Sequence, residues 1–442
     1  MTVGRPPFRS VSGPSSLAGL GDLPWLLDPG GGLALLTEAG LDVNDVQTNY
    51  LRLKPGGGAL VGVTVHHRGG SLPGYIRTGS GRRCAEVAAK WSRLGVPDTP
   101  LGRAVVVHPG GRSLICLFPA DAALRRLPGV VAPDTLKRLL ASLPILRDAD
   151  RRVSGRASHL HPLRYKPERR FVARLDARVR AEGGRPQRSA WVLRYLGGQR
   201  GTATAAAAGA LYRSGAPVPE PLGVLMGGQL LVEAHIPGRE LAESLPGDGA
   251  AAQALAGSLR RFHRCGAHLD AVMTPADLLV RAQRSLAVLT GVLPAEAGRA
   301  RAVLNGLYRA APDPSPLSPI HGDLHLHQVI LGPAGPVLVD VERAAMGDPL
   351  QDVGSLLAHL KAATGATGAR WMSDFGEEFV DAALRDGAGS ASRLAFHVAG
   401  GLVEQALLAF RQLQPSWPGR VATLLARAEA ETANRDRTAA RP

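Results

Sequence analysis

The sequence is poor in cysteine, in aromatic residues and in long apolar runs. Its three cysteines form no CxxC pair, and their odd number argues against a disulfide framework or a zinc site and favours a reducing compartment. Aromatic residues make up only 4% of the chain, which disfavours a nucleic-acid surface built on base stacking. No apolar stretch is long enough to cross a bilayer, and residues 1–40 contain no basic-then-apolar leader. We therefore predict a cytoplasmic protein with neither a membrane nor a nucleic-acid partner.

Positive charge is in clear excess, with 52 Lys and Arg against 37 Asp and Glu and a formal net charge of +15. Such an excess can favour nucleic acid or an anionic membrane. Here the basic residues are scattered, and Arg, Ala, Gly and Pro are abundant together, which is typical of a GC-rich coding bias. A positive cleft would attract an anionic nucleotide, but it would attract a polycationic substrate poorly.

Two β-like segments repeat a series of short motifs in the same order. Leu51-Arg-Leu-Lys-Pro55 recurs as Leu163-Arg-Tyr-Lys-Pro167, and Pro100-Leu-Gly102 recurs as Pro221-Leu-Gly223. The copies are separated by roughly 110 to 120 residues, which indicates an internal duplication of a small α+β unit. Coincidence in a chain rich in glycine and proline is the alternative. The first copy could also have a purely structural role, as a cover for the second or as a dimer surface.

Helical spacing of apolar residues dominates from Ala250 onward, interrupted by one β-like insert between Ala310 and Gln351. The pattern predicts five segments. They are a loose N-terminal segment at 1–40 with an apolar patch at Leu23–Leu27, a lobe-like extension at 41–150, a β-rich lobe at 151–236, a helical lobe at 237–432, and a frayed tail at 433–442.

The insert contains an ordered set of polar residues at the ends of apolar strands. It reads His321-Gly-Asp-Leu-His-Leu-His-Gln328, then a turn at 332–335, a return strand that carries Asp340, and Met346-Gly-Asp-Pro-Leu-Gln-Asp352. A hairpin brings Asp323 and Asp340 close together. Phosphoryl transfer needs one carboxylate to accept the proton of the attacking hydroxyl and another to hold Mg²⁺, with an amide oxygen as a further ligand.

This segment resembles the aminoglycoside phosphotransferase and choline kinase superfamily, whose members share the protein-kinase fold. The resemblance implies an α+β, bilobal fold with a small antiparallel sheet lobe and a mostly helical lobe. It implies that Asp323 is the catalytic base, that Asp340 and Gln328 bind Mg²⁺, that His321 is structural, and that Asp352 braces the loop at a helix N-terminus. Gln328 departs from the usual Asn, but it keeps the amide oxygen.

The resemblance also implies an ATP site in the β-rich lobe. Glu233 and His235 stand at the strand and hinge that present backbone groups to adenine. The usual phosphate-binding Lys is missing, and Arg194 takes its place, unless Arg194 is a plain surface residue and Lys166 substitutes for it. The helix at 202–212 has no Glu for the usual ion pair, whereas the first copy has Arg77 and Glu86 at the corresponding places.

We therefore predict an ATP- and Mg²⁺-dependent kinase that phosphorylates a hydroxyl of a small molecule of the aminoglycoside, amino alcohol or sugar type. The alternatives are a catalytically silent pseudokinase, favoured by the missing Lys and Glu, and a metallohydrolase that uses His321, Asp323, His325 and His327. The acidic stretch at 374–381 is either an amine-binding surface or a solvated helix face.

Overall fold

The computed structural model describes residues 28, 30–54, 58–92, 98–148, 151–154, 158–181, 184–198, 200–244, 249–313, 316–367, 370–385, 391–414 and 416–439. The predicted patch at Leu23–Leu27 lies outside these residues. The chain divides into two compact units, one of Met1–Gly198 with Phe410–Trp417, the other of Gln199–Ala409 with Pro418–Pro442. The predicted α+β class is confirmed, because both units combine helices with antiparallel strand pairs. No described helix is long and apolar enough to span a membrane.

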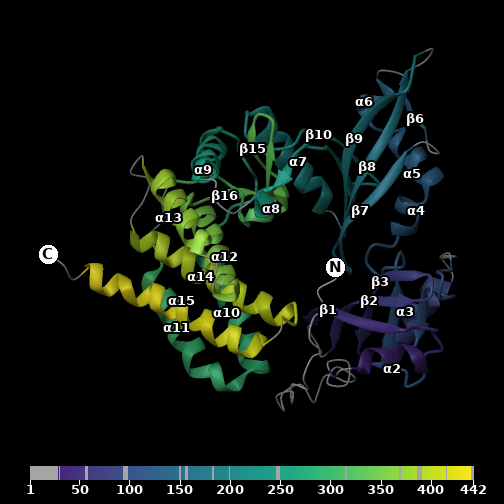
Figure 1. The fold of residues 1–442 in the computed structure, drawn as a ribbon, viewed down its shortest axis with the longest axis horizontal. Coiled ribbons are helices and arrows are strands. Elements are labelled where there is room, and N and C mark those ends of the chain that lie inside the picture. Colours follow the sequence, from purple (N-terminus) through teal and green to yellow (C-terminus); the bar gives the residue numbers. More distant parts are fainter. Residues whose placement is uncertain are drawn as a thin grey trace. The chain divides into compact units, whose positions relative to one another are not determined.

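The first unit begins with helix α2 (Gly31–Glu38) and a five-stranded antiparallel sheet (Figure 1). The strands are β1 (Asp45–Leu53), β2 (Ala59–His67), β3 (Gly70–Thr78), β4 (Val105–Val107) and β5 (Ser113–Leu117), in the order β1-β2-β3-β5-β4. Helix α3 (Gly81–Ser92) connects β3 to β4. The sequence reads Ser-Leu-Ile-Cys-Leu along β5, and all five residues are buried, as expected of an inner strand.

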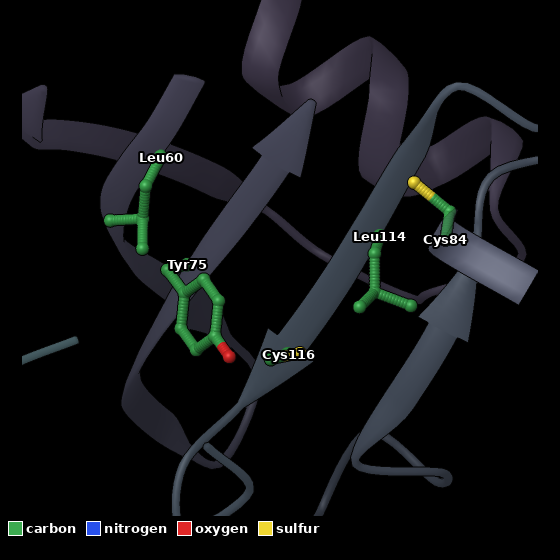
Figure 2. Close-up of a cluster of buried hydrophobic side chains, with 5 residues drawn as sticks. All are labelled: Leu60, Tyr75, Cys84, Leu114 and Cys116. Carbon is green, nitrogen blue, oxygen red and sulfur yellow. The ribbon is translucent and has the colours of Figure 1, made fainter. Parts of the chain in front are cut away.

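A cluster of buried side chains joins this sheet to helix α3. Leu60 of β2, Tyr75 of β3, and Leu114 and Cys116 of β5 lie with Cys84 of the helix in one core (Figure 2). The Tyr75 hydroxyl accepts the backbone N–H of Ala122 at 2.8 Å, so the one polar atom of the ring has a partner. Burial raises the pKa of the Cys116 thiol to about 12, which keeps it neutral and lets it pack as an apolar group.

Three short helices, α4 (Leu127–Val131), α5 (Pro133–Leu140) and α6 (Pro144–Arg147), lead to the second sheet of the unit. A proline stands in the first turn of each, where its missing N–H breaks no helical hydrogen bond. The strands that follow are β6 (Arg151–Val153), β7 (His159–Lys166), β8 (Arg170–Ala181) and β9 (Gln187–Leu196). Strand β8 is central, with β9 antiparallel along one edge and β7 and β6 along the other.

The structure repeats one succession of elements, in agreement with the duplication inferred from the motifs. The first copy has a three-stranded antiparallel meander β1-β2-β3, helix α3 and the antiparallel pair β4–β5. The second has the meander β7-β8-β9, helix α7 (Arg200–Arg213) and the antiparallel pair of β10 (Pro221–Leu225) with β11 (Leu230–Ala234). Six matching elements in one order are hard to explain by coincidence.

The second compact unit is mostly helical (Figure 1). After α7, β10 and β11 come β12 (Arg239–Glu240), α8 (Leu241–Ser244), α9 (Gly249–Arg264), α10 (Pro275–Val292), η2 (Pro294–Glu296), α11 (Ala297–Ala310), α12 (Leu350–Thr367), α13 (Arg370–Leu384), α14 (Ala391–Arg411) and α15 (Trp417–Ala439). The predicted face of α9 is buried, with Leu255, Leu259 and Phe262 at 2% exposure or less. Thr274 caps α10, because its side chain accepts the Asp277 N–H.

Two predictions at the chain ends are wrong in part. Residues 1–40 were predicted to be loose, yet α2 forms at Gly31–Glu38 and buries Leu35 and Leu36 completely. The tail was predicted to fray from 433, yet the backbone of α15 is helical to Ala439. In helix α2 the favourable free energy of burying two leucines outweighs the poor helix propensity of the glycines.

A single carboxylate links the two sheets of the first unit. Glu168 lies in the turn between β7 and β8, with a left-handed backbone at φ 57°. Its side chain, 6% exposed, forms ion pairs with Arg52 (3.3 Å), Arg77 (3.0 Å) and Lys54 of the first sheet. Its backbone N–H donates to Asp121 Oδ2 at 2.7 Å. The predicted counterpart Arg77 therefore pairs with Glu168, whereas Glu86 pairs with Arg82 on an exposed helix face.

Replacing Glu168 by Gln should destabilise the protein strongly. The three cations would remain close together without their shared anion, so the free energy of unfolding should fall by about 3 kcal/mol, as when one partner of a buried pair is removed. Urea unfolding, followed through the tryptophan fluorescence, measures this change. Glu86→Gln is the matched control, because an exposed helical pair contributes about 0.3–0.5 kcal/mol. Equal effects of the two substitutions would contradict the assigned role of Glu168.

Candidate active site

The predicted polar motif folds as two small antiparallel ladders in the second unit. Strand β13 (Ser318–Ile320) pairs with β16 (Ala345–Gly347), and β14 (Val329–Gly332) pairs with β15 (Gly335–Leu338) through the predicted turn. The short helices η3 (Leu326–Gln328) and η4 (Val341–Arg343) lie at the ends of the hairpin. The loop from His321 to His325 therefore starts and ends on strand pairs that fix its course.

Gly322 is required by the backbone of this loop. Its φ of 76° lies in the left-handed region that favours glycine, and a Cβ at this position would lie 2.4 Å from the carbonyl oxygen of Arg343. The loop can therefore approach η4 closely only because this residue has no side chain. The close approach places the neighbouring Asp323 beside Arg343.

The loop is held by the buried carboxylate of Asp352, in the first turn of α12. Asp352 Oδ1 accepts the N–H of Gly322 at 2.8 Å, and Oδ2 accepts the N–H of His321 at 2.8 Å. His263 Nε2 of α9 lies 2.9 Å from the same Oδ2. Burial by itself raises the pKa of Asp352, but the His263 hydrogen bond, the nearby histidine charges and the His321 N–H outweigh it, so the pKa falls below its usual range.

His321 connects the loop to the strand that precedes Asp340. The side chain is fully buried, and its Nε2 lies 2.9 Å from the carbonyl oxygen of Val339. Its ring also packs against Phe262 of α9, with centroids 6.3 Å apart. His321 is thus enclosed in the hairpin core and contacts the backbone next to Asp340.

Asp323 differs from its neighbours because it is partly exposed. Its side chain is 41% exposed, and Arg343 Nη1 donates to its Oδ1 at 3.3 Å. Within the described part of the chain, Oδ2 has no hydrogen-bond partner. One carboxylate oxygen is therefore fixed by a cation, while the other is open to a ligand.

Gln328 and Asp340 lie side by side at the base of the hairpin. The Gln328 carbonyl accepts the Val339 N–H at 2.9 Å, which brings Gln328 next to Asp340. The prediction that Asp340 stands on the return strand is wrong, because the strand ends at Leu338 and Asp340 has a left-handed backbone (φ 68°, ψ 49°) that begins η4. The chain has to turn sharply there to reach β16.

A cavity of about 60 Å³ opens beside Asp323. Its walls come from the loop and from three helices, which cross closely because glycines face neighbouring side chains at Gly354, Gly400 and Gly401. The polar residues that line it are Arg281 of α10, Gln351, Ser355 and His359 of α12, His397, Glu404 and Gln405 of α14, and Asp323 and Arg343. The cavity places Asp323 at the edge of a partly open space lined by polar side chains.

His359 is a neutral acceptor in the wall of this cavity. Burial lowers its pKa to about 4, although Asp323 acts in the opposite direction. The neutral ring accepts the amide N–H of Gln405, with 2.8 Å between the two nitrogens, and lies against the ring of His325 in a tilted arrangement with centroids 4.7 Å apart. His359 Nε2 and the Gln405 amide nitrogen are therefore hydrogen-bonded to each other.

His397 joins the cavity wall to Asp348 of the Gly-Asp-Pro motif. Its Nε2 lies 3.0 Å from Asp348 Oδ2, and Arg393 Nη2 donates to the same oxygen at 2.6 Å. Burial alone raises the pKa of Asp348, but the hydrogen bond and charge of His397 and the hydrogen bond from Arg393 outweigh it, and the pKa falls from 3.8 to about 2.

The remaining residues of the predicted site lie elsewhere. Glu233 is buried on β11, and His235 follows that strand. Arg194 is buried on β9 and Lys166 ends β7, both in the first compact unit, and their contact with a nucleotide stays a prediction. The acidic residues at 374–381 are exposed on α13 and do not line the cavity, which favours a solvated face.

The histidines of the motif do not form a metal cluster. Among the described residues, no three or more His, Cys, Asp or Glu side chains are placed to hold a metal ion together. His327 is exposed, and its Nδ1 lies 2.8 Å from Glu240. This arrangement disfavours the metallohydrolase alternative.

The model of the phosphotransferase enzyme family matches residues 151–397, which is more than half of the chain. The chain belongs to this family. The family match includes the second β-rich copy, the polar motif and most of the cavity, whereas the first copy lies outside it. The sheet of the first copy is therefore an addition to the part of the chain that matches the family. No curated protein matches the chain.

Solved structures that resemble this phosphotransferase include three kinases. A choline/ethanolamine kinase family protein from Mesorhizobium loti is 22% identical, with 68% of this chain and 98% of that chain covered and a TM-score of 0.46. Choline kinase LicA from Streptococcus pneumoniae is 13% identical, with 68% and 98% covered and a TM-score of 0.45. An aminoglycoside-3′-phosphotransferase of type VIII is 23% identical, with 57% and 95% covered and a TM-score of 0.41.

Sequence reasoning missed most of the cavity lining. Arg281 and His359 stand on helices whose contacts depend on the tertiary structure. Glu404 and Gln405 could have been found from the sequence, because they are two polar residues inside an otherwise apolar run of α14. Such an interruption of a buried helix face is often functional.

Asp348→Asn should change the acid sensitivity of the protein. The folded pKa of about 2 lies below the ordinary 3.8, so ionised Asp348 contributes stability above about pH 4, and the contribution is lost as the pH falls through 2. The Tm of the wild type should exceed that of the variant at pH 6, and the gap should close towards pH 2. Asp374→Asn, on the exposed face of α13, should leave the Tm unchanged throughout. A gap for Asp348→Asn that persists at pH 2 would count against this assignment.

Proposed function

We propose that the protein transfers the γ-phosphate of ATP to a hydroxyl of a small molecule, with Asp323 as the catalytic base. The observation that carries the proposal is the open oxygen of Asp323 at the edge of a partly open cavity with polar walls. Family membership supports phosphoryl transfer as the reaction class. The identity of ATP as donor and of a hydroxyl as acceptor belongs to the proposal.

Asp323 performs the proton transfer. The acceptor hydroxyl donates a hydrogen bond to Oδ2, and its oxygen attacks the γ-phosphorus in line. The hydroxyl proton passes to Asp323, the bond between the γ-phosphorus and the bridging oxygen breaks, and ADP leaves. Arg343 holds Oδ1 and so fixes the orientation of the carboxylate. The loop does not have to reorganise during the reaction, because Asp352 already satisfies its backbone N–H groups.

Gln328 and Asp340 fit a Mg²⁺ site. Gln328 is 5% exposed, and its Oε1 is buried without a hydrogen-bond partner in the described part of the chain, which is costly for an amide oxygen unless a ligand uses it. Mg²⁺ prefers oxygen ligands and in kinases takes one or two protein groups together with substrate phosphates. When bound there, Mg²⁺ would offset the negative charge of the phosphates. Gln328 thus supplies the amide oxygen that Asn supplies in relatives of the usual motif.

Asp323→Asn should abolish turnover while leaving the fold intact. Asparagine keeps the hydrogen bond with Arg343 but cannot accept the hydroxyl proton, so kcat should fall by about 10²- to 10⁴-fold. ADP release with Mg²⁺ and ATP, measured against a panel of aminoglycosides, amino alcohols and sugars, tests this expectation. His327→Gln, in the same loop but facing solvent, should change kcat less than about 3-fold.

The same assay distinguishes the pseudokinase alternative. Calorimetric binding of MgATP without turnover of any acceptor would favour a silent nucleotide-binding protein. Equal turnover by the wild type and Asp323→Asn would disprove the role of Asp323.

Gln328→Ala should raise the Mg²⁺ requirement, because one oxygen ligand is lost. We expect the Mg²⁺ concentration for half-maximal thermal stabilisation by ADP to rise about 10-fold, as for removal of one group that supports a metal. Gln328→Asn retains the amide oxygen, so the Mg²⁺ concentration for half-maximal stabilisation should change less. The readout is the Tm with ADP over a Mg²⁺ series, which needs no acceptor. An unchanged Mg²⁺ midpoint for Gln328→Ala would remove this residue from the metal site.

A further inference from the structure

The second sheet of the first unit holds most of the positive charge of the chain. Residues 151–200, which include β6 to β9, contain 14 Lys and Arg against three Asp and Glu, whereas the formal net charge of the whole chain is +15. We predicted no nucleic-acid partner because the basic residues are scattered along the sequence. The fold brings many of them together on neighbouring strands (Figure 1). Their placement on the sheet therefore decides what the charge can do.

Strand β8 sorts its apolar and basic residues onto opposite faces. Ala177 and Val179 are at most 6% exposed and belong to the core. Arg178 and Arg180 alternate with them, and successive side chains of a strand point to opposite faces. Both arginines therefore lie on the face of the sheet that is turned away from this core.

The pairing of the strands places another arginine directly opposite each of these two. Arg178 is paired with Arg188 of β9, and Arg180 is paired with Arg152 of β6. Directly opposite side chains share a face, with Cβ atoms about 4.5–5.5 Å apart. These four residues, here called the arginine cluster, are exposed except for the half-buried Arg178. Like charges directly opposite each other destabilise a sheet, so the pairing does not serve the fold.

The guanidiniums of the arginine cluster keep most of their hydrogen-bond donors. Apart from Arg180, its members have no side-chain hydrogen bond or ion pair within the described part of the chain. Arg180 donates its Nε to the Gly184 carbonyl at 3.1 Å, which leaves its terminal nitrogens available. Asp176, the next residue of β8 on this face, already pairs with Arg174 at 2.8 Å and His161 at 3.0 Å. The cluster is thus complementary to an external anion.

The surroundings of the arginine cluster select the class of anion. Among the described residues, the exposed large apolar side chains include none on β6, β8 or β9. The surface therefore lacks the apolar centre of a protein–protein interface and the apolar residues that insert into a membrane. The aromatic residues of these strands are at most 5% exposed, which removes stacking on unpaired bases; they are Phe171, Trp191 and Tyr195. A strongly cationic, polar surface is typical of contact with nucleic acid.

We infer that the arginine cluster binds the phosphate backbone of double-helical nucleic acid without reading its sequence. A duplex presents closely spaced phosphates, and the planar guanidinium binds phosphate through two parallel hydrogen bonds. The affinity should be that of non-specific binding, with a Kd of roughly 10⁻⁴–10⁻⁶ M at physiological salt. The inference is independent of the proposed function, because the cluster lies in the first compact unit and none of its members lines the cavity.

Fluorescence anisotropy with labelled duplexes over a salt series tests the inference. The probes are DNA and RNA duplexes, each in two unrelated sequences, and the corresponding single strands. We expect a duplex of at least one kind to bind, with equal affinity for both sequences and more tightly than its single strand. Changing Arg178 and Arg188 together to Gln should weaken binding at least about 10-fold. The plot of log K against log salt should become shallower by about 2, because two phosphate contacts are lost.

Arg103→Gln combined with Arg112→Gln is the matched control. Both arginines are exposed in the first copy, so this variant has the same net charge as the cluster variant. It should retain the wild-type salt slope. The Tm of the cluster variant should equal or exceed that of the wild type, because a pair of opposed like charges is removed.

Several outcomes would overturn the inference. Equal weakening by the two variants would attribute binding to net charge alone, and tighter binding of single strands would contradict backbone recognition of a duplex. A lower Tm of the cluster variant would assign the arginines to the fold. Binding to phosphatidylserine vesicles, or salt-sensitive self-association, without binding to either duplex would assign the cluster to a membrane or to a second copy of the chain.

Discussion

The buried carboxylate of Asp352 is the constraint on which the candidate site depends. It lies at the start of α12, and it holds two successive backbone N–H groups of the loop and the ring of His263. A fully buried anion is stable only with several donors. Three elements distant in sequence, α9, the loop and α12, must therefore meet at this point. Their meeting leaves Gly322 against η4 and Asp323 at the edge of the cavity.

The cationic side chains of the first copy pair with a carboxylate of the second copy. The first copy keeps the meander, the helix and the strand pair, and its Arg77 corresponds to Arg194 of the second copy, which we predicted to bind phosphate. Arg77, with Arg52 and Lys54, binds Glu168 from the turn of the second copy. An internal carboxylate thus occupies the cationic cluster. The charges now hold two sheets together, and the interaction is strong because water reaches it poorly.

Most of the cavity wall is formed by packed helices, and the motif segment contributes Gly322, Asp323 and Arg343. Glycines let α12 and α14 approach so closely that a methyl group at Gly401 would lie 2.6 Å from Ala358. The close crossing places polar side chains of both helices in the wall of the cavity beside Asp323. The loop and the helices therefore contribute different parts of the candidate site: the loop supplies Asp323, and the helices supply most of the other polar side chains of the cavity wall.

The sequence by itself determined the class of fold, the hairpin, the loop and the family, because glycines, carboxylates and apolar runs at fixed spacing act locally. It also indicated the duplication, since repeated motifs survive in order. It placed Asp340 on a strand, whereas the need to turn toward β16 puts it in a left-handed conformation. The partnership of Glu168 with three cations and the gathering of polar side chains from α10, α12 and α14 around one cavity were decided only by the tertiary structure. The ion pair of Arg52 with Glu168 joins residues 116 positions apart, and no local pattern encodes it.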